Sequence, residues 1–71
     1  MSDLIAIVKA TRSSARALAD CQRIARAIRE VEKSGDTATA VNMYRSLIRA
    51  QRRYARAQEI LAANPLPGDK A

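Results

Sequence analysis

Small and apolar residues recur along the first half of the chain at alternating spacings of three and four. These residues are Ile7, Ala10, Ser14, Ala17, Cys21, Ile24, Ile28 and Val31. Such a heptad-like spacing is typical of an α-helix that packs along another helix. Thr11, Leu18 and Ala25 widen the pattern along one flank. The pattern predicts one amphipathic helix from about residue 3 to 33, with Ser2 as its N-cap and Asp3 in its first turn.

The segment Ser34-Gly35-Asp36-Thr37 interrupts the pattern. Glycine suits the left-handed backbone conformation that often follows a helix, and Asp36 or Thr37 suits the N-cap of a second helix. Because a turn over residues 34–37 is so short, the two helices are expected to run antiparallel, as a helical hairpin.

The second helix is expected from about residue 37 to 63, with a broad apolar face. That face comprises Ala40, Val41, Tyr44, Leu47, Ile48, Gln51, Tyr54, Ala55, Gln58, Leu61 and Ala62. Asn64-Pro65 ends the helix, because the residue before a proline is disfavoured in the helical conformation. The fold class is therefore all-α, with a hairpin over residues 1–64 and a flexible tail over residues 65–71.

A few residues around the turn resemble the turn and second-helix start of a tetratricopeptide repeat. These residues are Gly35, Asp36, Ala40 and Tyr44, with Ile24, Ala27 and Ile28 upstream. Arrays of such repeats need at least three units, whereas this chain has one, and its second helix is too long. We therefore interpret the likeness as a general property of helical hairpins and assign no family.

The chain is short for a stable single core. With 71 residues, a domain buries only ~60% of its unfolded surface, and its one cysteine allows no intramolecular disulfide. No third element completes the two apolar faces. We therefore expect a homodimer that forms a four-helix bundle; the alternative is a loosely packed hairpin that a partner completes. The expected core and dimer residues are Ile7, Ala10, Ser14, Ala17, Leu18, Cys21, Ile24, Ile28, Val31, Leu47, Ile48, Tyr54 and Leu61.

The residues that usually carry catalysis are missing or scattered. The chain has no histidine, and Cys21 lies on the apolar pattern, where a thiol acts as a small hydrophobic group. No spacing fits a metal site or a phosphate-binding loop. We expect no enzymatic activity, cofactor, metal or small-molecule substrate. The apolar run 4–8 is too short for a signal peptide or a membrane span, so we expect a cytoplasmic protein without a membrane role.

Charge is distributed unequally between the two helices. On the first helix, acids lie within a turn of arginines, as Asp20 does with Arg16 and Arg23. The stretch RSLIRAQRRYARAQ (45–58) instead carries five arginines and no acid. Arginine suits bidentate contact with carboxylate or phosphate groups, although a solvated surface is the simpler interpretation. The expected partner-binding residues are Arg45, Arg49, Arg52, Arg53 and Arg56, with Tyr44 as an aromatic anchor.

A net charge of +6 favours an acidic partner, and we expect that partner to be a protein. Arginine and tyrosine are enriched at protein-interface hot spots, whereas two long helices fit no sequence-specific DNA-binding motif. The chain resembles, in size and composition, the compact inhibitors and adaptors that phages and mobile elements direct at host regulators or ATPases. Our first hypothesis is a non-enzymatic module that docks on another protein and inhibits it. The alternative is nonspecific nucleic-acid binding through the same arginines.

Overall fold

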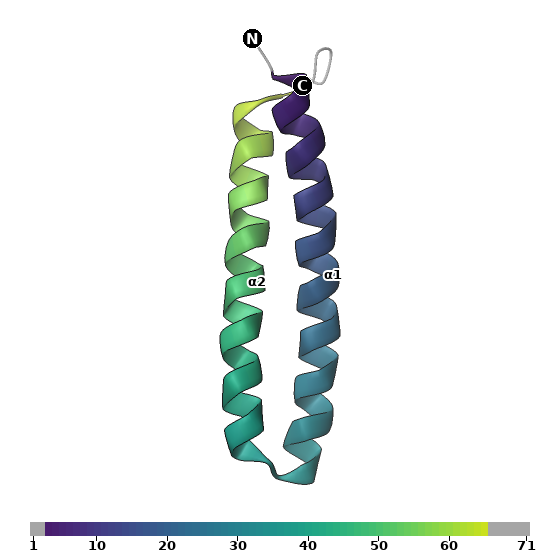
Figure 1. Cartoon of the computed structure of the whole chain (residues 1–71), viewed down its shortest axis with the longest axis vertical. Coiled ribbons are helices and arrows are strands. Elements are labelled where there is room, and N and C mark those ends of the chain that lie inside the picture. The colour runs from purple at the N-terminus through teal and green to yellow at the C-terminus, as the bar shows by residue number, and fades with distance from the viewer. Residues whose placement is uncertain (1–2, 66–71) are drawn as a thin grey trace.

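The computed structural model describes residues 3–65, which form two antiparallel helices joined by a short turn (Figure 1). Helix α1 spans Leu4–Ser34 and helix α2 spans Thr37–Ala63. The hairpin is a rod with extents of 51 × 17 × 17 Å. The expectation of an all-helical hairpin is confirmed. Most of the expected tail, residues 66–71, lies outside the described residues.

The N-terminus of α1 is capped by Asp3. Its backbone is extended (φ −94°, ψ 103°), and its carboxylate accepts hydrogen bonds from the N–H groups of Ile5 at 3.0 Å and Ala6 at 3.2 Å. The prediction that Asp3 lies in the first turn, behind a Ser2 cap, was therefore wrong. A helix start presents four free N–H groups, and a carboxylate at the cap can accept from two of them, so the helix begins one residue later.

The turn has the expected chemistry. Gly35 adopts φ 82°, and its N–H donates to the carbonyl of Glu32 at 3.1 Å. Asp36 caps α2, accepting from the Thr39 N–H at 3.1 Å and from the Thr39 hydroxyl at 2.6 Å. These two hydrogen bonds stabilise the carboxylate and lower the pKa of Asp36 below its ordinary value.

The two helices pack along a seam made mostly of alanine. The buried residues are Ile7, Ala10, Ala17 and Ile28 of α1, and Ala40, Ala50 and Ala57 of α2. Within residues 3–65, no large side chain is completely removed from solvent. Alanine lets two backbones approach closely, but it removes little apolar area from water. The core inside the hairpin is therefore thin.

The buried face of α2 is rotated from the one that the sequence suggested. It runs through half-buried Met43 and buried Ala50 and Ala57, which are seven residues apart. Val41 and Ile48 instead remain 47% and 46% exposed. The sequence-based prediction assumed that the large aliphatic side chains of α2 would be the buried ones. Packing at small residues brings the helices closer together, and the branched side chains are then left on the flank of the seam.

A polar contact holds the open end of the hairpin together. The N–H of Asp3 donates to the side-chain oxygen of Asn64 at 3.2 Å, and the side-chain amide of Asn64 donates to the carbonyl of Ile60 at 2.9 Å. Asn64 therefore joins the start of α1 to the end of α2, which lie side by side in Figure 1.

Enlarging the alanine at the centre of the seam should separate the helices. Ala50 is 0% exposed, so Ala50→Leu overpacks the seam and should lower the free energy of unfolding by about 1–3 kcal/mol. Chemical denaturation measures this loss. Ala19→Leu makes the same change on an exposed position of α1 and should alter stability by less than about 0.5 kcal/mol. Equal stabilities for the two variants would contradict the alanine seam.

Candidate partner-binding site

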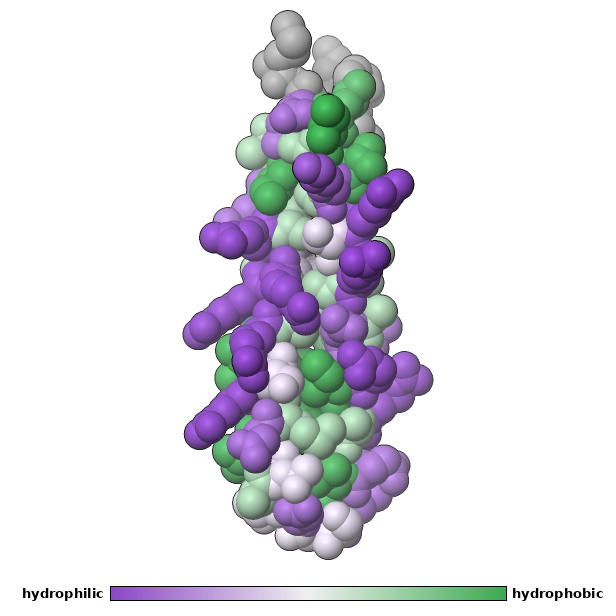
Figure 2. Space-filling model, viewed as in Figure 1, coloured by the Kyte–Doolittle hydropathy of each residue, from purple (hydrophilic) through white to green (hydrophobic). Residues whose placement is uncertain are grey.

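Lysine and arginine side chains from both helices gather on one side of the seam. We call this side the basic face, and define it by the cations that line its grooves. They are Lys9, Arg16 and Arg23 of α1, and Arg49, Arg52, Arg53 and Arg56 of α2. Figure 2 shows hydrophilic side chains projecting from both helices, with less polar surface between them. Asp20 and Glu59 are the acids that line the described grooves of this face.

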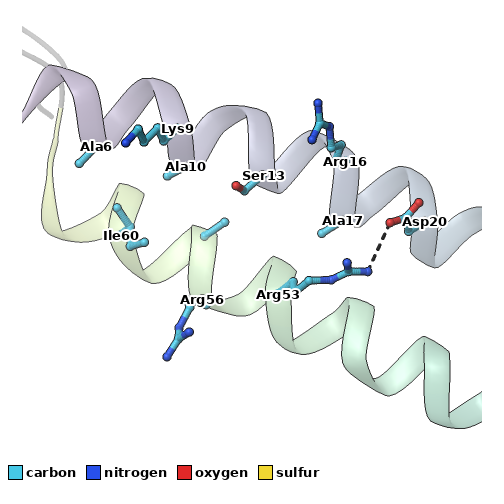
Figure 3. Close-up of a pocket in the computed structure, with 11 residues that line it drawn as sticks. Ala6, Lys9, Ala10, Ser13, Arg16, Ala17, Asp20, Arg53, Arg56 and Ile60 are labelled. Carbon is cyan, nitrogen blue, oxygen red and sulfur yellow. Dashed lines mark hydrogen bonds and ion pairs between the residues drawn. The ribbon is translucent and has the colours of Figure 1, made fainter.

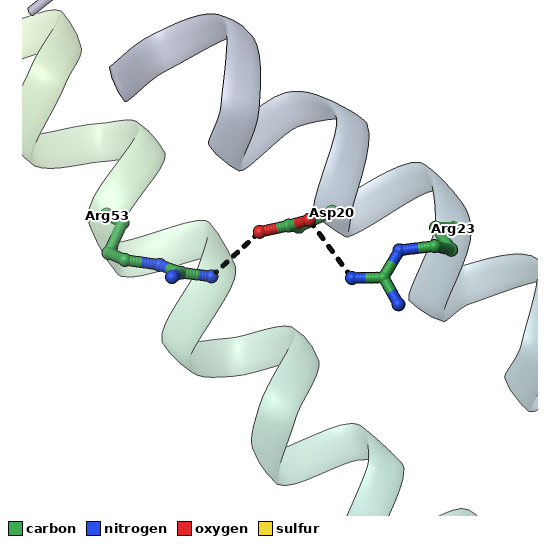
Figure 4. Close-up of polar contacts among 3 residues, drawn as sticks. All are labelled: Asp20, Arg23 and Arg53. Atoms are coloured by element: carbon green, nitrogen blue, oxygen red, sulfur yellow. Dashed lines mark hydrogen bonds and ion pairs between the residues drawn. The ribbon is translucent and has the colours of Figure 1, made fainter. Parts of the chain in front are cut away.

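Asp20 connects the helices at the middle of the basic face. Its carboxylate lies 3.0 Å from the guanidinium of Arg23 and 3.3 Å from that of Arg53 (Figure 4). The Asp20 side chain is 32% exposed, and ion pairs this close to water contribute only ~0–1 kcal/mol to stability. Their main effect is therefore on position, because they hold Arg53 across the seam.

The five arginines of α2 that were predicted to bind a partner have different surroundings in the structure. Arg53 has no acid within one turn of its own helix, but the fold supplies Asp20 from α1. Arg49, Arg52 and Arg56 line the basic face and form no ion pair within residues 3–65. Arg45 is exposed and lines none of the grooves described below. Four of the five predicted arginines thus lie on the basic face.

One groove of the basic face, which we call the alanine groove, lies between the two helices and has a volume of about 470 Å³. Its floor is formed by small or apolar side chains and its rims by cations (Figure 3). The floor comprises Ala6, Ala10, Ser13, Ala17, Ala57 and Ile60. The rims carry Lys9 and Arg16 on α1, and Arg53 and Arg56 on α2. A second groove adjoins it beyond the Asp20–Arg53 bridge.

The other side of the seam carries no charge over most of its length. Leu18 lies two residues before Asp20, and Gln51 two before Arg53, so each is about 200° around its helix from the ion pair. We call this side the uncharged flank. On α1 it comprises Val8, Thr11, Ala15, Leu18, Gln22 and Ala25, and on α2 Val41, Tyr44, Ile48, Gln51, Ala55, Gln58 and Ala62. Several of its large apolar side chains are 44–49% exposed, namely Val8, Leu18, Val41 and Ile48.

Two polar contacts cross the seam on the uncharged flank. The side-chain amide of Gln58 donates to the hydroxyl of Ser14 at 2.7 Å, and the hydroxyl of Tyr44 donates to Glu32 at 3.1 Å. The hydrogen bond to Glu32 and the negative charge of its carboxylate raise the pKa of Tyr44. Tyr44 therefore lies apart from the arginines with which it was grouped as a partner-binding residue.

The predicted core and dimer residues occupy three environments. Ile7, Ala10, Ala17 and Ile28 are buried, while Leu18 and Ile48 are exposed on the uncharged flank. The half-buried members are Ser14, Cys21, Ile24, Val31, Leu47, Tyr54 and Leu61. Sequence reasoning missed Met43, Ala50 and Ala57 in the seam. Extending the alternating spacing of three and four from Ala40 would have found all three.

Three further properties of the chain concern membrane spanning, metal binding and similarity to known proteins. Neither helix is both long and apolar enough to cross a membrane. Residues 3–65 hold no group of three or more histidine, cysteine, aspartate or glutamate side chains placed to bind a metal. No protein-family model matches the sequence, and comparisons with curated proteins and with solved structures give no significant match.

Removing the carboxylate at the centre of the basic face should strengthen polyanion binding. Asp20→Asn leaves Arg23 and Arg53 without their partner, so the variant should elute from heparin at higher salt. Stability should change by less than about 1 kcal/mol, as for other exposed ion pairs. Glu32→Gln removes the same charge beside the uncharged flank and is the control. Equal elution of the two variants would show that total charge, and not the basic face, determines polyanion binding.

Proposed function

We propose that this protein is a non-enzymatic binding module of the cytoplasm whose basic face docks on an acidic surface of another protein and inhibits it. The main support is the arrangement of cations from two helices around a shared groove with a small, apolar floor. The single thiol, Cys21, is half-buried in the seam, which suits packing better than chemistry.

The apolar floor favours a protein partner over nucleic acid. A nucleic-acid backbone gains affinity mainly by releasing counterions as cations contact its phosphates, and it offers little apolar surface to an alanine floor. A protein surface can contribute both carboxylates and apolar side chains, and arginine is enriched where such interfaces form. Nonspecific nucleic-acid binding is the second candidate, because Arg49, Arg52 and Arg56 have no ion pair within residues 3–65.

We also propose that two hairpins associate through their uncharged flanks and form a four-helix bundle. The seam within one hairpin buries mostly alanine, while Leu18, Val41 and Ile48 remain exposed on the uncharged flank. The charged residues on that flank, Arg29 and Glu32, lie near the turn. Packing that flank against a second copy would remove large side chains from water without bringing like charges together. Each hairpin of the dimer would then present its basic face outward.

Reversing charge on α2 should abolish partner binding. Arg49→Glu combined with Arg52→Glu alters two exposed residues of the basic face, so helicity should persist while capture of an acidic protein from cell lysate is lost. The control, Arg12→Glu with Arg26→Glu, makes the same change in net charge on exposed positions of α1 that line none of the described grooves.

Binding to random duplex DNA distinguishes the two candidate functions. We expect no binding at ~50 mM salt, whereas tight binding with a steep salt dependence would favour nucleic acid. Retention of the captured protein by the Arg49/Arg52 variant would instead show that these arginines are only solvated surface.

Charging the uncharged flank should dissociate the dimer. Ile48→Asp places a carboxylate in the proposed interface, so its mass by sedimentation should fall from twice the chain mass of 7.8 kDa to one chain. Ile5→Asp introduces the same group at a residue that is 69% exposed and lies off the flank, and it should leave the dimer intact. A wild-type chain that sediments as a stable monomer at micromolar concentration would refute the dimer.

A further inference from the structure

We infer that the alanine groove of the basic face receives a single amphipathic helix of the partner, with a narrow stripe of small apolar residues between two rows of acids. This inference rests on the proposed function and identifies which part of the acidic partner the basic face holds. Three properties of the groove carry it: its shape, the composition of its floor and the positions of its cations.

The groove has the shape of a rod. Along α1 it extends from Ala6 to Asp20, which at 1.5 Å per residue is about 21 Å, or four helical turns. The Asp20–Arg53 ion pair crosses the groove at its end nearer the middle of the hairpin (Figure 3). Ile60 lies near the other end, toward the open end of the hairpin. Two antiparallel helices form its walls, so a third helix can lie along them over this length.

The walls of the groove offer almost nothing to an extended peptide. An extended segment needs backbone hydrogen-bond partners, as when it adds to a sheet edge, but the backbone groups of α1 and α2 are already bonded within the helices. A helix satisfies its own backbone groups and can present side chains alone. The floor is made largely of alanine, so a partner helix with small residues on its contact stripe can approach closely.

The cations define the charge pattern of the partner helix. Lys9 and Arg16 are seven residues apart on one rim, and Arg53 and Arg56 are three apart on the other. These spacings equal two turns and about one turn of a helix. Glutamates at matching spacings on both edges of the partner stripe would therefore face the two rims. In Figure 3, Arg16 and Arg56 point away from the groove, and Arg53 reaches toward Asp20. The side chains of Arg16 and Arg56 would turn inward on binding.

A second copy of this chain is a poor occupant of the groove. In each copy, seven cations line the grooves, and the acids that line them are Asp20 and Glu59. Two such positively charged faces would repel each other. The uncharged flank carries no charge over most of its length, so it offers little such repulsion. Charge complementarity thus assigns the groove to an acidic helix and leaves the opposite flank for self-association.

Designed peptides and one groove-filling substitution test this inference. The probe is an 18-residue helical peptide with an alanine stripe between two rows of glutamate, labelled for fluorescence anisotropy. A peptide of the same composition with the stripe scrambled keeps its charge and loses its pattern. Ser13→Trp fills the groove from an exposed position on its floor, and Ala19→Trp adds the same bulk at an exposed position that does not line it.

We expect the patterned peptide to bind the wild type and Ala19→Trp alike, and Ser13→Trp at least about tenfold more weakly, as for loss of an interface hot spot. The scrambled peptide should bind at least about tenfold more weakly than the patterned one. Circular dichroism establishes that both tryptophan variants keep their helices.

Two results would overturn the inference in different ways. If the scrambled peptide binds as tightly as the patterned one, or Ser13→Trp binds the patterned peptide normally, the basic face recognises acidic charge without a helix in the groove, and the proposed function survives. If neither acidic peptide binds while duplex DNA does, both the inference and the proposed protein-binding function fail.

Discussion

The close packing of alanine against alanine constrains everything else in this hairpin. Ala10 and Ala17 of α1 and Ala50 and Ala57 of α2 are buried, and their size allows the two backbones to lie near each other along the rod. Close approach leaves little space for large side chains beside these alanines, and the buried isoleucines, Ile7 and Ile28, lie nearer the two ends of the rod. The aliphatic residues of α2 that would ordinarily fill a core, such as Ile48, therefore lie beside the seam and remain partly exposed.

This constraint gives the rod two chemically different sides. On one side, cations from both helices surround a groove with an alanine floor, and Asp20 holds Arg53 in place across it. On the other side, exposed aliphatic residues form a surface without charge over most of its length. The first surface suits an acidic partner and the second suits a copy of the same chain. Because the surfaces lie on opposite sides of the seam, binding and self-association need not compete.

The sequence predicted the features that depend on local spacing. Gly35 and Asp36 identified the turn, because a left-handed residue and a helix cap each require particular residue types. Features that depend on how the helices face each other were harder to predict. The face of α2 that was predicted to be buried was chosen by its large side chains, such as Ile48, whereas the buried face contains Ala50. The partner of Arg53 is 33 residues away in sequence, so reasoning about one helix at a time could not find it. Tyr44 likewise needed the packing to show which side it occupies.

We propose that the alanine seam is too thin to stabilise one hairpin alone, so that folding is coupled to pairing through the uncharged flank. Thermal unfolding at two protein concentrations, about 1 and 100 µM, measures this coupling, because a dimer that dissociates on unfolding melts at a temperature that depends on concentration. We expect an unfolding midpoint several degrees higher at the greater concentration. The same midpoint at both concentrations, with full helicity before the transition, would contradict it.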